Sequence, residues 1–461
     1  MVLGTFTPNT ISKKVEYTIS RKTFEVLLSS KILPQNIILD SNKKNFEINF
    51  KKLILERREL DKKTYNIVNK IIKDVKKRGH KALVQHEQKF QNNSIIVPSK
   101  KDINKAIKAL DKETKNALRQ AYKRIYKWHA LQVKKDIYQK DELGNKFYYK
   151  NVPITNIGVY CPNLPSSAMM NCVPAQLARC KRIVLCSPRP NGKLNGAVLY
   201  AAKLCGVSEF ISLSGAGAIA AMAFGTKKLK ACDKIVGPGG EITQTAKKIL
   251  FLSNKIGVER FYGGPSEICC WVDSSSPPDE IASSLVSQAE HGYKSSSIMI
   301  CKDKKLIEKV KKCISEQLKD LPRKDIAKKS INKYGALIYA KNDKKIIELI
   351  NFIAPEHLEI PIKSYRKQLK HITNVGSIAA GPYSCMSLGD YGPQQHSLPT
   401  SGSARYSGGL NVQEYTKWIS INIISKKGLA KLSKVGYVFT KKIENLIGHY
   451  RSIKMKNMRI K

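Results

Sequence analysis

Four short segments of the chain carry side chains that could bind a divalent metal or transfer protons. They are Gln288-Ala-Glu-His291, Pro355-Glu356-His357, Gly389-Asp390-Tyr391 and Glu444-Asn-Leu-Ile-Gly-His449. Taken singly, each has a simpler explanation. A histidine on a helix is more often a core residue, an aspartate beside glycine usually forms a turn, and a histidine in a basic tail is usually just exposed. Taken together, they supply imidazole and carboxylate donors of the kind that zinc accepts. The set favours a zinc-dependent alcohol oxidation.

Two of these segments also have a spacing that suits their chemistry. Gln288 and His291 stand three residues apart near the end of a predicted helix, so their side chains share one face. Glu356 and His357 follow another predicted helix. An imidazole is the natural base for an alcohol proton, and a neighbouring glutamate can activate water. In isolation, a surface Glu-His pair remains the simpler interpretation.

Two glycine-rich turns could hold a phosphate. Gly215-Ala-Gly217 and Gly237-Pro-Gly-Gly240 each follow a predicted strand and begin a predicted helix. The free amides at a helix N-terminus bind anions. Neither turn has the G-x-G-x-x-G spacing of a dinucleotide fingerprint, so a simple tight turn is at least as compatible with each.

Short β-rich runs alternate with helical stretches from residue 157 onward, and a second series of the same kind begins at residue 267. This alternation is typical of parallel, doubly wound sheets. We therefore predict an α/β fold with two Rossmann-like doubly wound units, a helical N-terminal arm and an extended helical C-terminal tail. The expected parts are an arm over 1–50, a first domain over 51–156 with 266–408, a second, cofactor-side domain over 157–265, and a tail over 409–461.

The formal net charge is +46, from 82 basic and 36 acidic residues in a chain of 461. The lysines are spread along the whole sequence and form no stripe with interleaved aromatic residues, so we expect no specific nucleic-acid partner. No apolar run reaches the length of a membrane span, and 11 cysteines without a C-x-x-C pair suggest a reducing compartment. We expect a cytoplasmic protein, although the acid-poor N-terminus leaves an organelle transit peptide open.

The chain resembles the histidinol dehydrogenase family from about residue 55 to its C-terminus. The similar segments occur in the family's order, which makes chance agreement very improbable. They are RGHKAL (78–83), GVYCP (158–162), LPSSAMMNCVPA (164–175), LCSPRP (185–190), GAIAAMAFGT (217–226), IVGPGG (235–240), GGPSE (263–267), SQAEHG (287–292), APEHL (354–358), GDY (389–391) and HSLPTSGSARYSGGL (396–410).

The resemblance implies oxidation of L-histidinol to L-histidine through the aldehyde, with two NAD⁺ used in succession and one Zn²⁺ per subunit. His357 matches the general base, and Glu356 matches the residue that activates water. It further implies an obligate homodimer in which the C-terminal tail completes the neighbour's site. By the same resemblance, the metal is held by Gln288, His291, Asp390 and His449, the substrate is contacted by Ser266, His357, His396, Glu444 and the metal-binding residues, and NAD⁺ is contacted at Tyr160, Gly217 and Gly240.

The departures from the family pattern lie on the cofactor side. Glycine stands at 217 and 240, where the family has a glutamine and an asparagine that contact NAD, and the loop over 162–165 is shorter. Each lost amide would leave a partner unpaired, which costs about 1–3 kcal/mol when that partner is buried. We therefore expect weakened NAD affinity with an intact zinc and proton apparatus.

Two other functions stay open. A related zinc- and NAD-dependent dehydrogenase would act on another small polar alcohol, but the presence of both Glu444 and His449 favours histidinol. An inactive descendant that binds polyanions would explain the charge and the altered cofactor loops. Polyanion binding, however, needs no zinc donors at the positions of the metal set.

Overall fold

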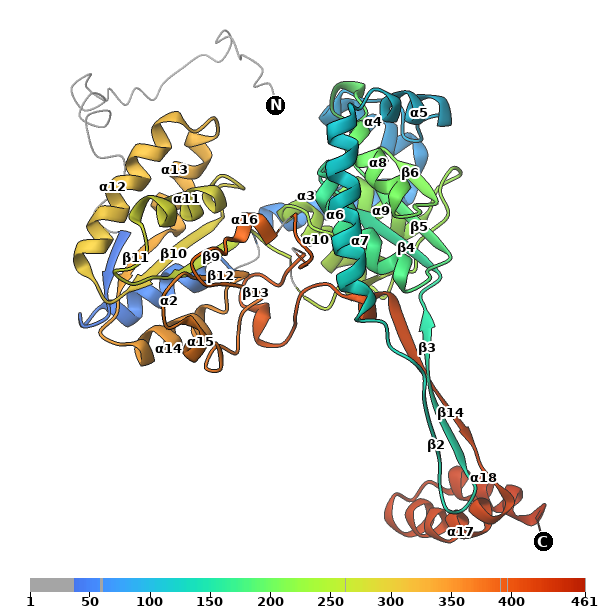
Figure 1. The fold of residues 1–461 in the computed structure, drawn as a ribbon. Coiled ribbons are helices and arrows are strands. Elements are labelled where there is room, and N and C mark those ends of the chain that lie inside the picture. The colour runs from blue at the N-terminus through green and yellow to red at the C-terminus, as the bar shows by residue number, and fades with distance from the viewer. Residues whose placement is uncertain (1–36, 59–60, 262, 390, 396, 461) are drawn as a thin grey trace, which may run out of the picture.

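The computed structural model describes residues 37–58, 61–261, 263–389, 391–395 and 397–460. Figure 1 shows two α/β bodies side by side and a long ribbon that extends from one of them to a small helical unit at the C-terminal end. Asp390 and His396 lie outside the described residues, as do residues 1–36.

The first body contains a six-stranded parallel sheet in the order β1-β11-β10-β9-β12-β13. Its strand side chains alternate between two apolar clusters, as Cys269 and Cys270 show in neighbouring positions of β9. Helices cover both faces, so the sheet is doubly wound. The strands are β1 (Ile38–Asp40), β9 (Glu267–Trp271), β10 (Ser296–Cys301), β11 (Ala336–Tyr339), β12 (His357–Ile360) and β13 (Ser377–Ala380), and the helices include α2 (Phe46–Glu56), α11 (Pro278–Ala289), α12 (Lys304–Asp320), α13 (Lys324–Tyr334), α14 (Asp343–Ile353), α15 (Tyr365–Leu369) and α16 (Met386–Gly389).

The second body contains a five-stranded parallel sheet in the order β6-β5-β4-β7-β8. Leu185 and Cys186 of β5 again belong to clusters on opposite faces. The strands are β4 (Asn156–Tyr160), β5 (Arg182–Cys186), β6 (Glu209–Ile211), β7 (Lys234–Val236) and β8 (Gly257–Val258), and the helices are α3 (Lys62–Arg78), α4 (His80–Gln91), α5 (Lys100–Lys108), α6 (Lys112–Ala130), α7 (Pro165–Leu177), α8 (Gly196–Leu204), α9 (Gly215–Phe224) and α10 (Glu241–Leu252).

The predicted α/β class with parallel sheets is confirmed, but the structure divides the chain differently from the predicted boundaries. Strand β1 and the first part of helix α2, which fall in the predicted arm, belong to the first body. The helices over 62–130 pack on the second body, because α3 contributes Val68, Ile72 and Val75 to the core beneath α9. Helical periodicity reveals an apolar face but does not say which sheet that face covers.

The C-terminal tail was predicted to be helical, but the structure also contains a strand there. Strand β14 (Thr416–Ile423) pairs antiparallel with β3 (Lys146–Pro153), which pairs with β2 (Ile137–Lys140). This ribbon ends in a unit formed by α17 (Lys426–Tyr437), the π-helical turn η5 (Val438–Ile443) and α18 (Ile447–Met458). We call β2, β3, β14 and this unit the C-terminal arm.

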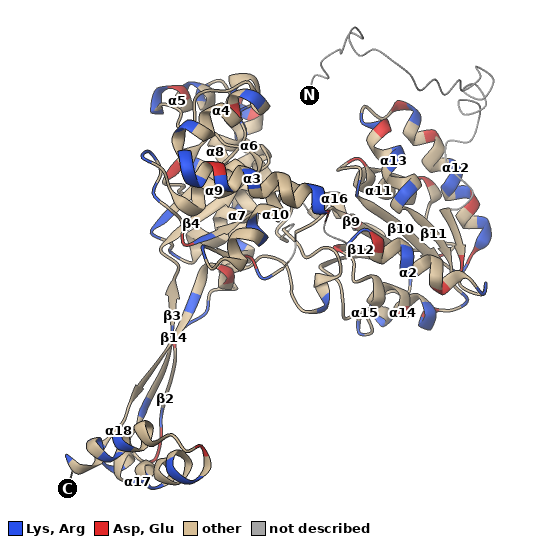
Figure 2. Ribbon diagram, turned by 180° about the vertical axis from the view of Figure 1, so that it is seen from behind, with Lys and Arg blue, Asp and Glu red and all other residues tan. Residues whose placement is uncertain are grey.

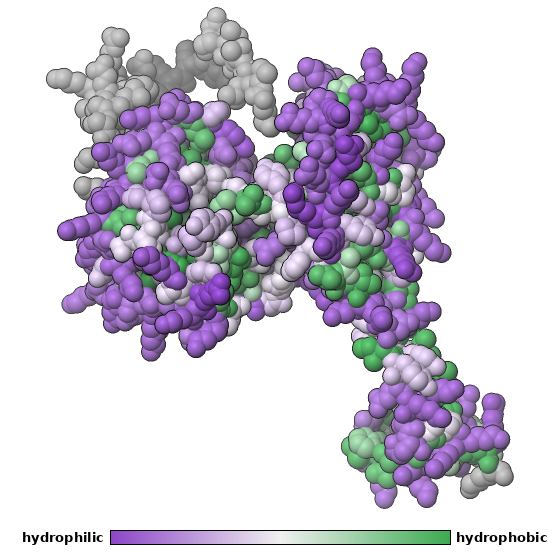
Figure 3. Space-filling model, in the orientation of Figure 1, coloured by the Kyte–Doolittle hydropathy of each residue, from purple (hydrophilic) through white to green (hydrophobic). Residues whose placement is uncertain are grey.

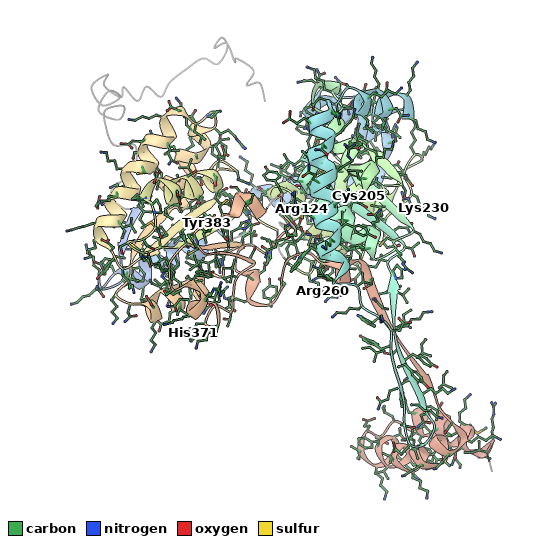
Figure 4. The ribbon with its side chains drawn as sticks, in the orientation of Figure 1. Arg124, Cys205, Lys230, Arg260, His371 and Tyr383 are labelled. Atoms are coloured by element: carbon green, nitrogen blue, oxygen red, sulfur yellow. The ribbon has the colours of Figure 1, made fainter. Side chains whose placement is uncertain are left out.

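The base of the C-terminal arm is fixed to the second body by a buried carboxylate. Glu414, in the short helix η4 (Val412–Tyr415), accepts a hydrogen bond from Lys234 Nζ at 2.6 Å. It also pairs at 3.3 Å with Arg260, which Figure 4 labels near the base of the arm. Further out, Ile419, Ile421 and Phe439 are exposed, and Figure 3 shows apolar surface on the arm and its helical unit.

Basic residues occur in every part of the molecule. In the view of Figure 2, lysine and arginine are distributed over both bodies and the arm. Among the described helices, none is long and apolar enough to cross a bilayer. All 11 cysteines are free, and burial raises the pKa of Cys161 and Cys232 to about 11, so these two thiols behave as small apolar side chains.

Candidate active site between the two sheets

A cleft of about 650 Å³ lies between the two bodies. The first body lines it with Ser266, Gln288, His291, Glu356 and His357. Ser266 precedes β9 and His357 begins β12, so this body contributes the amino ends of its strands. The second body contributes the turn after β7, at the carboxyl end of its sheet, where doubly wound folds usually bind ligands.

The carboxylate of Glu356 is held by a reciprocal pair of hydrogen bonds. Its Oε2 accepts from the backbone N–H of Glu267 at 2.9 Å, and the Oε2 of Glu267 accepts from the N–H of Glu356 at 3.2 Å. Both residues are buried. Because β9 and β12 are adjacent in the sheet, this pairing fixes the direction in which Glu356 meets the cleft.

Arg57 holds the pair formed by Glu267 and Glu356 in place through a contact with Glu267. This arginine was not identified from the sequence. Its guanidinium forms a buried ion pair with Glu267. Its Nη1 also donates to the carbonyl oxygens of Pro265 at 3.1 Å and Lys294 at 2.9 Å. Glu267 completes its own set by accepting from the N–H of Ser401 at 2.9 Å. Arg57 thus joins Lys294 to the segment over 265–267, and Glu267 links that segment to Ser401 and Glu356.

Replacing Arg57 by methionine is expected to lower the free energy of unfolding by about 3–5 kcal/mol, because Glu267 would remain as an unpaired buried charge. Denaturant unfolding of the purified variant measures this loss. The matched control is Arg78→Met, which breaks a surface pair with Asp74 and should change stability little. Equal, small losses in the two variants would contradict the assigned role of Arg57.

Gln288, near the end of α11, and His291, two residues beyond the end of that helix, both line the cleft. Gln288 is 1% exposed, and its Oε1 has no hydrogen-bond partner among the described residues. The Nδ1 of His291 lies 3.0 Å from the carbonyl oxygen of Ser287 and can donate to it. That hydrogen bond would leave Nε2 as the acceptor nitrogen, which is the arrangement found for metal-bound histidines. Both side chains therefore suit a metal.

The rest of the predicted metal set is not brought to this place within one chain. Glu444 and His449 are exposed on the C-terminal arm and do not line the cleft. In Figure 1 their helical unit lies at the far end of the ribbon from both bodies. Accordingly, no group of three or more His, Cys, Asp or Glu gathers as a metal site within the described ranges. Asp390, the remaining predicted donor, lies outside those ranges.

On the opposite wall, the turn Gly237-Pro-Gly-Gly240 lines the cleft at the start of α10. Gly237 has φ of +114°, and a Cβ there would stand 2.1 Å from the carbonyl oxygen of Tyr160, so only glycine fits. The sole acid in the first turn of α10, Glu241, is paired with Lys294 at 2.8 Å. The backbone amides of this turn thus remain suited to an anion.

The other two predicted cofactor residues lie behind this turn and are absent from the cleft lining. Tyr160 ends β4, and its hydroxyl accepts from the N–H of Gly215 at 3.3 Å. Burial raises the pKa of this hydroxyl to about 12. Gly217 is buried inside α9. Gly240, in contrast, faces the cleft, with no atom within 4 Å of an added Cβ.

Comparison with known proteins gives a consistent result. The family model described as histidinol dehydrogenase matches residues 55–457. A histidinol dehydrogenase from Pelagibacter ubique is 47% identical over 421 residues, covering 90% of this chain and 98% of the relative. One from Acinetobacter baylyi is 36% identical over 425 residues, covering 90% and 98%.

A solved structure extends this agreement from sequence to fold. The crystal structure of histidinol dehydrogenase from Elizabethkingia anophelis superimposes with a TM-score of 0.84 at 31% identity, over 92% of this chain and 98% of that one. The match over nearly the whole length of both chains confirms the resemblance seen in the sequence. This chain belongs to the histidinol dehydrogenase family of oxidoreductases.

Proposed function

We propose that this protein oxidises L-histidinol to L-histidine through histidinal, with two NAD⁺ reduced in succession and one zinc ion per subunit. The observation that carries the proposal is the convergence at one cleft of Gln288, His291, Glu356 and His357. They come from α11, from the segment that follows it and from the start of β12, and they face a glycine turn suited to a phosphate. Family membership supports the choice of histidinol as substrate.

The proton chemistry follows from the two adjacent residues at the start of β12. His357 would take the hydroxyl proton of the substrate as the hydride leaves toward NAD⁺. Glu356, aimed by the N–H of Glu267, would then orient and deprotonate the water that adds to the aldehyde. The resulting hydrate keeps the C–H bond of the aldehyde and carries two hydroxyl groups, so a second NAD⁺ can accept that hydride while one hydroxyl loses its proton, which gives the acid.

The residues present fit a zinc ion. Gln288 offers a buried oxygen without a described hydrogen-bond partner, and His291 offers Nε2 when its Nδ1 donates to Ser287. Asp390 and His449 would complete the set, the latter from a second subunit. Bound there, zinc would orient the substrate through its nitrogen atoms. Ser266 and His357 line the same cleft as substrate contacts, with His396 and Glu444 expected to join them.

A homodimer with shared sites is supported by the C-terminal arm. Strand β14 has eight residues and spans about 27 Å. The helical unit that follows it has few contacts with the two bodies of the same chain. The exposed isoleucines of β14 are typical of a surface that another molecule covers. An arm that reaches a second copy would bring Glu444 and His449 to that copy's cleft.

The decisive experiment is an assay of purified protein with zinc, histidinol and NAD⁺. We expect about two NADH for each histidine formed, since the alcohol and the hydrate are oxidised in turn. Removing the metal with a chelator is expected to abolish turnover, and adding zinc back should restore it, while NAD⁺ binding in the absence of substrate persists.

The same assay separates the alternatives. Faster turnover of another amino alcohol than of histidinol would favour the related dehydrogenase. Absence of turnover on every alcohol, together with polyanion binding that vanishes at moderate salt, would favour the inactive descendant.

A further inference from the structure

Gln244 is a buried amide with a donor left over. It lies on α10, one helical turn beyond Gly240, and lines the cleft. The residue is 3% exposed, and its Nε2 has no hydrogen-bond partner among the described residues. This amide lies against Gly263, since an added Cβ there would stand 3.0 Å from Nε2. The side chain of Gln244 therefore packs against the loop that leads to Ser266.

A buried acceptor stands on the same wall. Glu259 is 5% exposed and lines the cleft, and its Oε1 forms an ion pair with Lys247 Nζ. Its Oε2 has no hydrogen-bond partner among the described residues. Lys247 follows Gln244 by three residues on α10, so the two share one helix face. A donor and an acceptor thus lie beside the glycine turn.

Gln244 Nε2 and Glu259 Oε2 do not stabilise the chain in the absence of a ligand. A buried polar atom without a partner is unfavourable, and an apolar side chain of similar shape would be neutral or better. Their position in the cleft wall, rather than in a core, indicates that the missing partner is a bound molecule. Hydroxyl groups and a carboxamide can both accept from Gln244 and donate to Glu259.

We propose that Gln244 and Glu259 form a polar subsite for the dinucleotide, in which the amide of Gln244 replaces the side-chain amide that Gly240 lacks. The subsite takes a ribose hydroxyl or the nicotinamide carboxamide, since both groups can donate and accept. This inference rests on the proposed use of NAD⁺. It implies that cofactor recognition is displaced by one helical turn rather than simply lost at Gly240.

The test is calorimetric titration of the whole protein with NAD⁺, without substrate, for the native chain and Gln244→Met. Methionine keeps the length of the side chain and removes the donor. We expect NAD⁺ affinity to fall by about 3–10-fold, the usual effect of one hydrogen bond. The melting temperature without ligand should stay the same or rise, and only the stabilisation by NAD⁺ should shrink.

The matched control lies one residue further along the same helix. Thr245 is also buried, and its Oγ1 also lacks a described partner, but it does not line the cleft. Thr245→Val should leave NAD⁺ affinity unchanged. A fall in the ligand-free melting temperature of Gln244→Met with unchanged NAD⁺ affinity would show a structural role and overturn the proposal.

A second substitution tests the replacement directly. Gly240 has φ of −65° and ψ of 178°, a conformation open to any residue, and space around its Cβ position. Gly240→Asn should restore most of the lost affinity in the Gln244→Met background and add much less to the native chain. Equal gains in both backgrounds would mean that the two sites act independently, against the proposal.

Fragments of NAD⁺ distinguish a ribose hydroxyl from the nicotinamide carboxamide as the group bound in the subsite. A Gln244→Met defect seen with ADP-ribose assigns the subsite to a ribose, and one seen only with nicotinamide mononucleotide assigns it to the carboxamide. If the native protein does not bind NAD⁺, the proposed function itself fails. If native and Gln244→Met proteins bind NAD⁺ equally, the function stands and the subsite is wrong.

Discussion

Replacing His357 by alanine is expected to lower the turnover of histidinol by about 10²–10⁴-fold, the usual contribution of a positioned general base. The imidazole begins β12 at the cleft, beside the carboxylate that we assign to water activation. Because the proton must leave as the hydride does, the loss should appear in kcat. Steady-state kinetics of NADH formation measure it, and NAD⁺ titration should show unchanged cofactor affinity.

Glu356→Gln is the informative companion variant. It keeps an oxygen for the hydrogen bond from the Glu267 N–H but removes the negative charge. The first oxidation should survive, whereas hydration and the second oxidation should slow. Histidinal should therefore accumulate, and the ratio of NADH to histidine should rise well above that of the native protein. Full turnover without His357, or an unchanged ratio in Glu356→Gln, would refute the division of roles.

Local rules were sufficient for most individual elements. The apolar spacing of Val68, Ile72 and Val75 predicts a helix that stops near Gly79, and α3 ends at Arg78 with Gly79 at φ of +53°. The alternation of strands and helices likewise predicts both parallel sheets. Each of these features depends on residues that are near one another in the sequence, so a single sequence contains the needed information.

The assembly of those elements was harder to predict. Strand β14 was missed although Ile419, Ile421 and Ile423 alternate with polar residues, because the strand lies in a basic tail that otherwise has a helical pattern. The pairing of β1 with β11 and the packing of α3 on α9 join segments that are distant in sequence. Periodicity alone carries no information about such partners.

The same distinction between local patterns and long-range contacts applies to the candidate site. Residues with distinctive chemistry, such as Gln288, His291 and His357, were predicted from type and spacing, and the structure brings them to one cleft. Arg57 and Gln244 were not predicted, since a lone arginine or glutamine has no local signal. Their importance arises only from burial and from contacts across the chain.

A mixed dimer of His357→Ala and His449→Ala chains is expected to regain about half of the native activity, although each variant alone should be nearly inactive. His357 lies in the cleft of its own chain, whereas His449 lies on the C-terminal arm, remote from that cleft. If the arm serves the neighbour, one site of the mixed dimer receives both substitutions and the other receives neither. Co-expression with two affinity tags yields the mixed species, whose activity is measured as the histidine formed, because a Glu356→Gln site still forms NADH in the first oxidation.

The matched control is a mixed dimer of His357→Ala and Glu356→Gln chains. Both substitutions lie in the cleft of their own chain, so each site keeps one defect and no intact site can form. If each chain instead completed its own site, the His357→Ala and His449→Ala mixture would also carry one defect per site and stay inactive. Recovery in the first mixture and none in the second is expected only when the arm of one chain completes the cleft of the other.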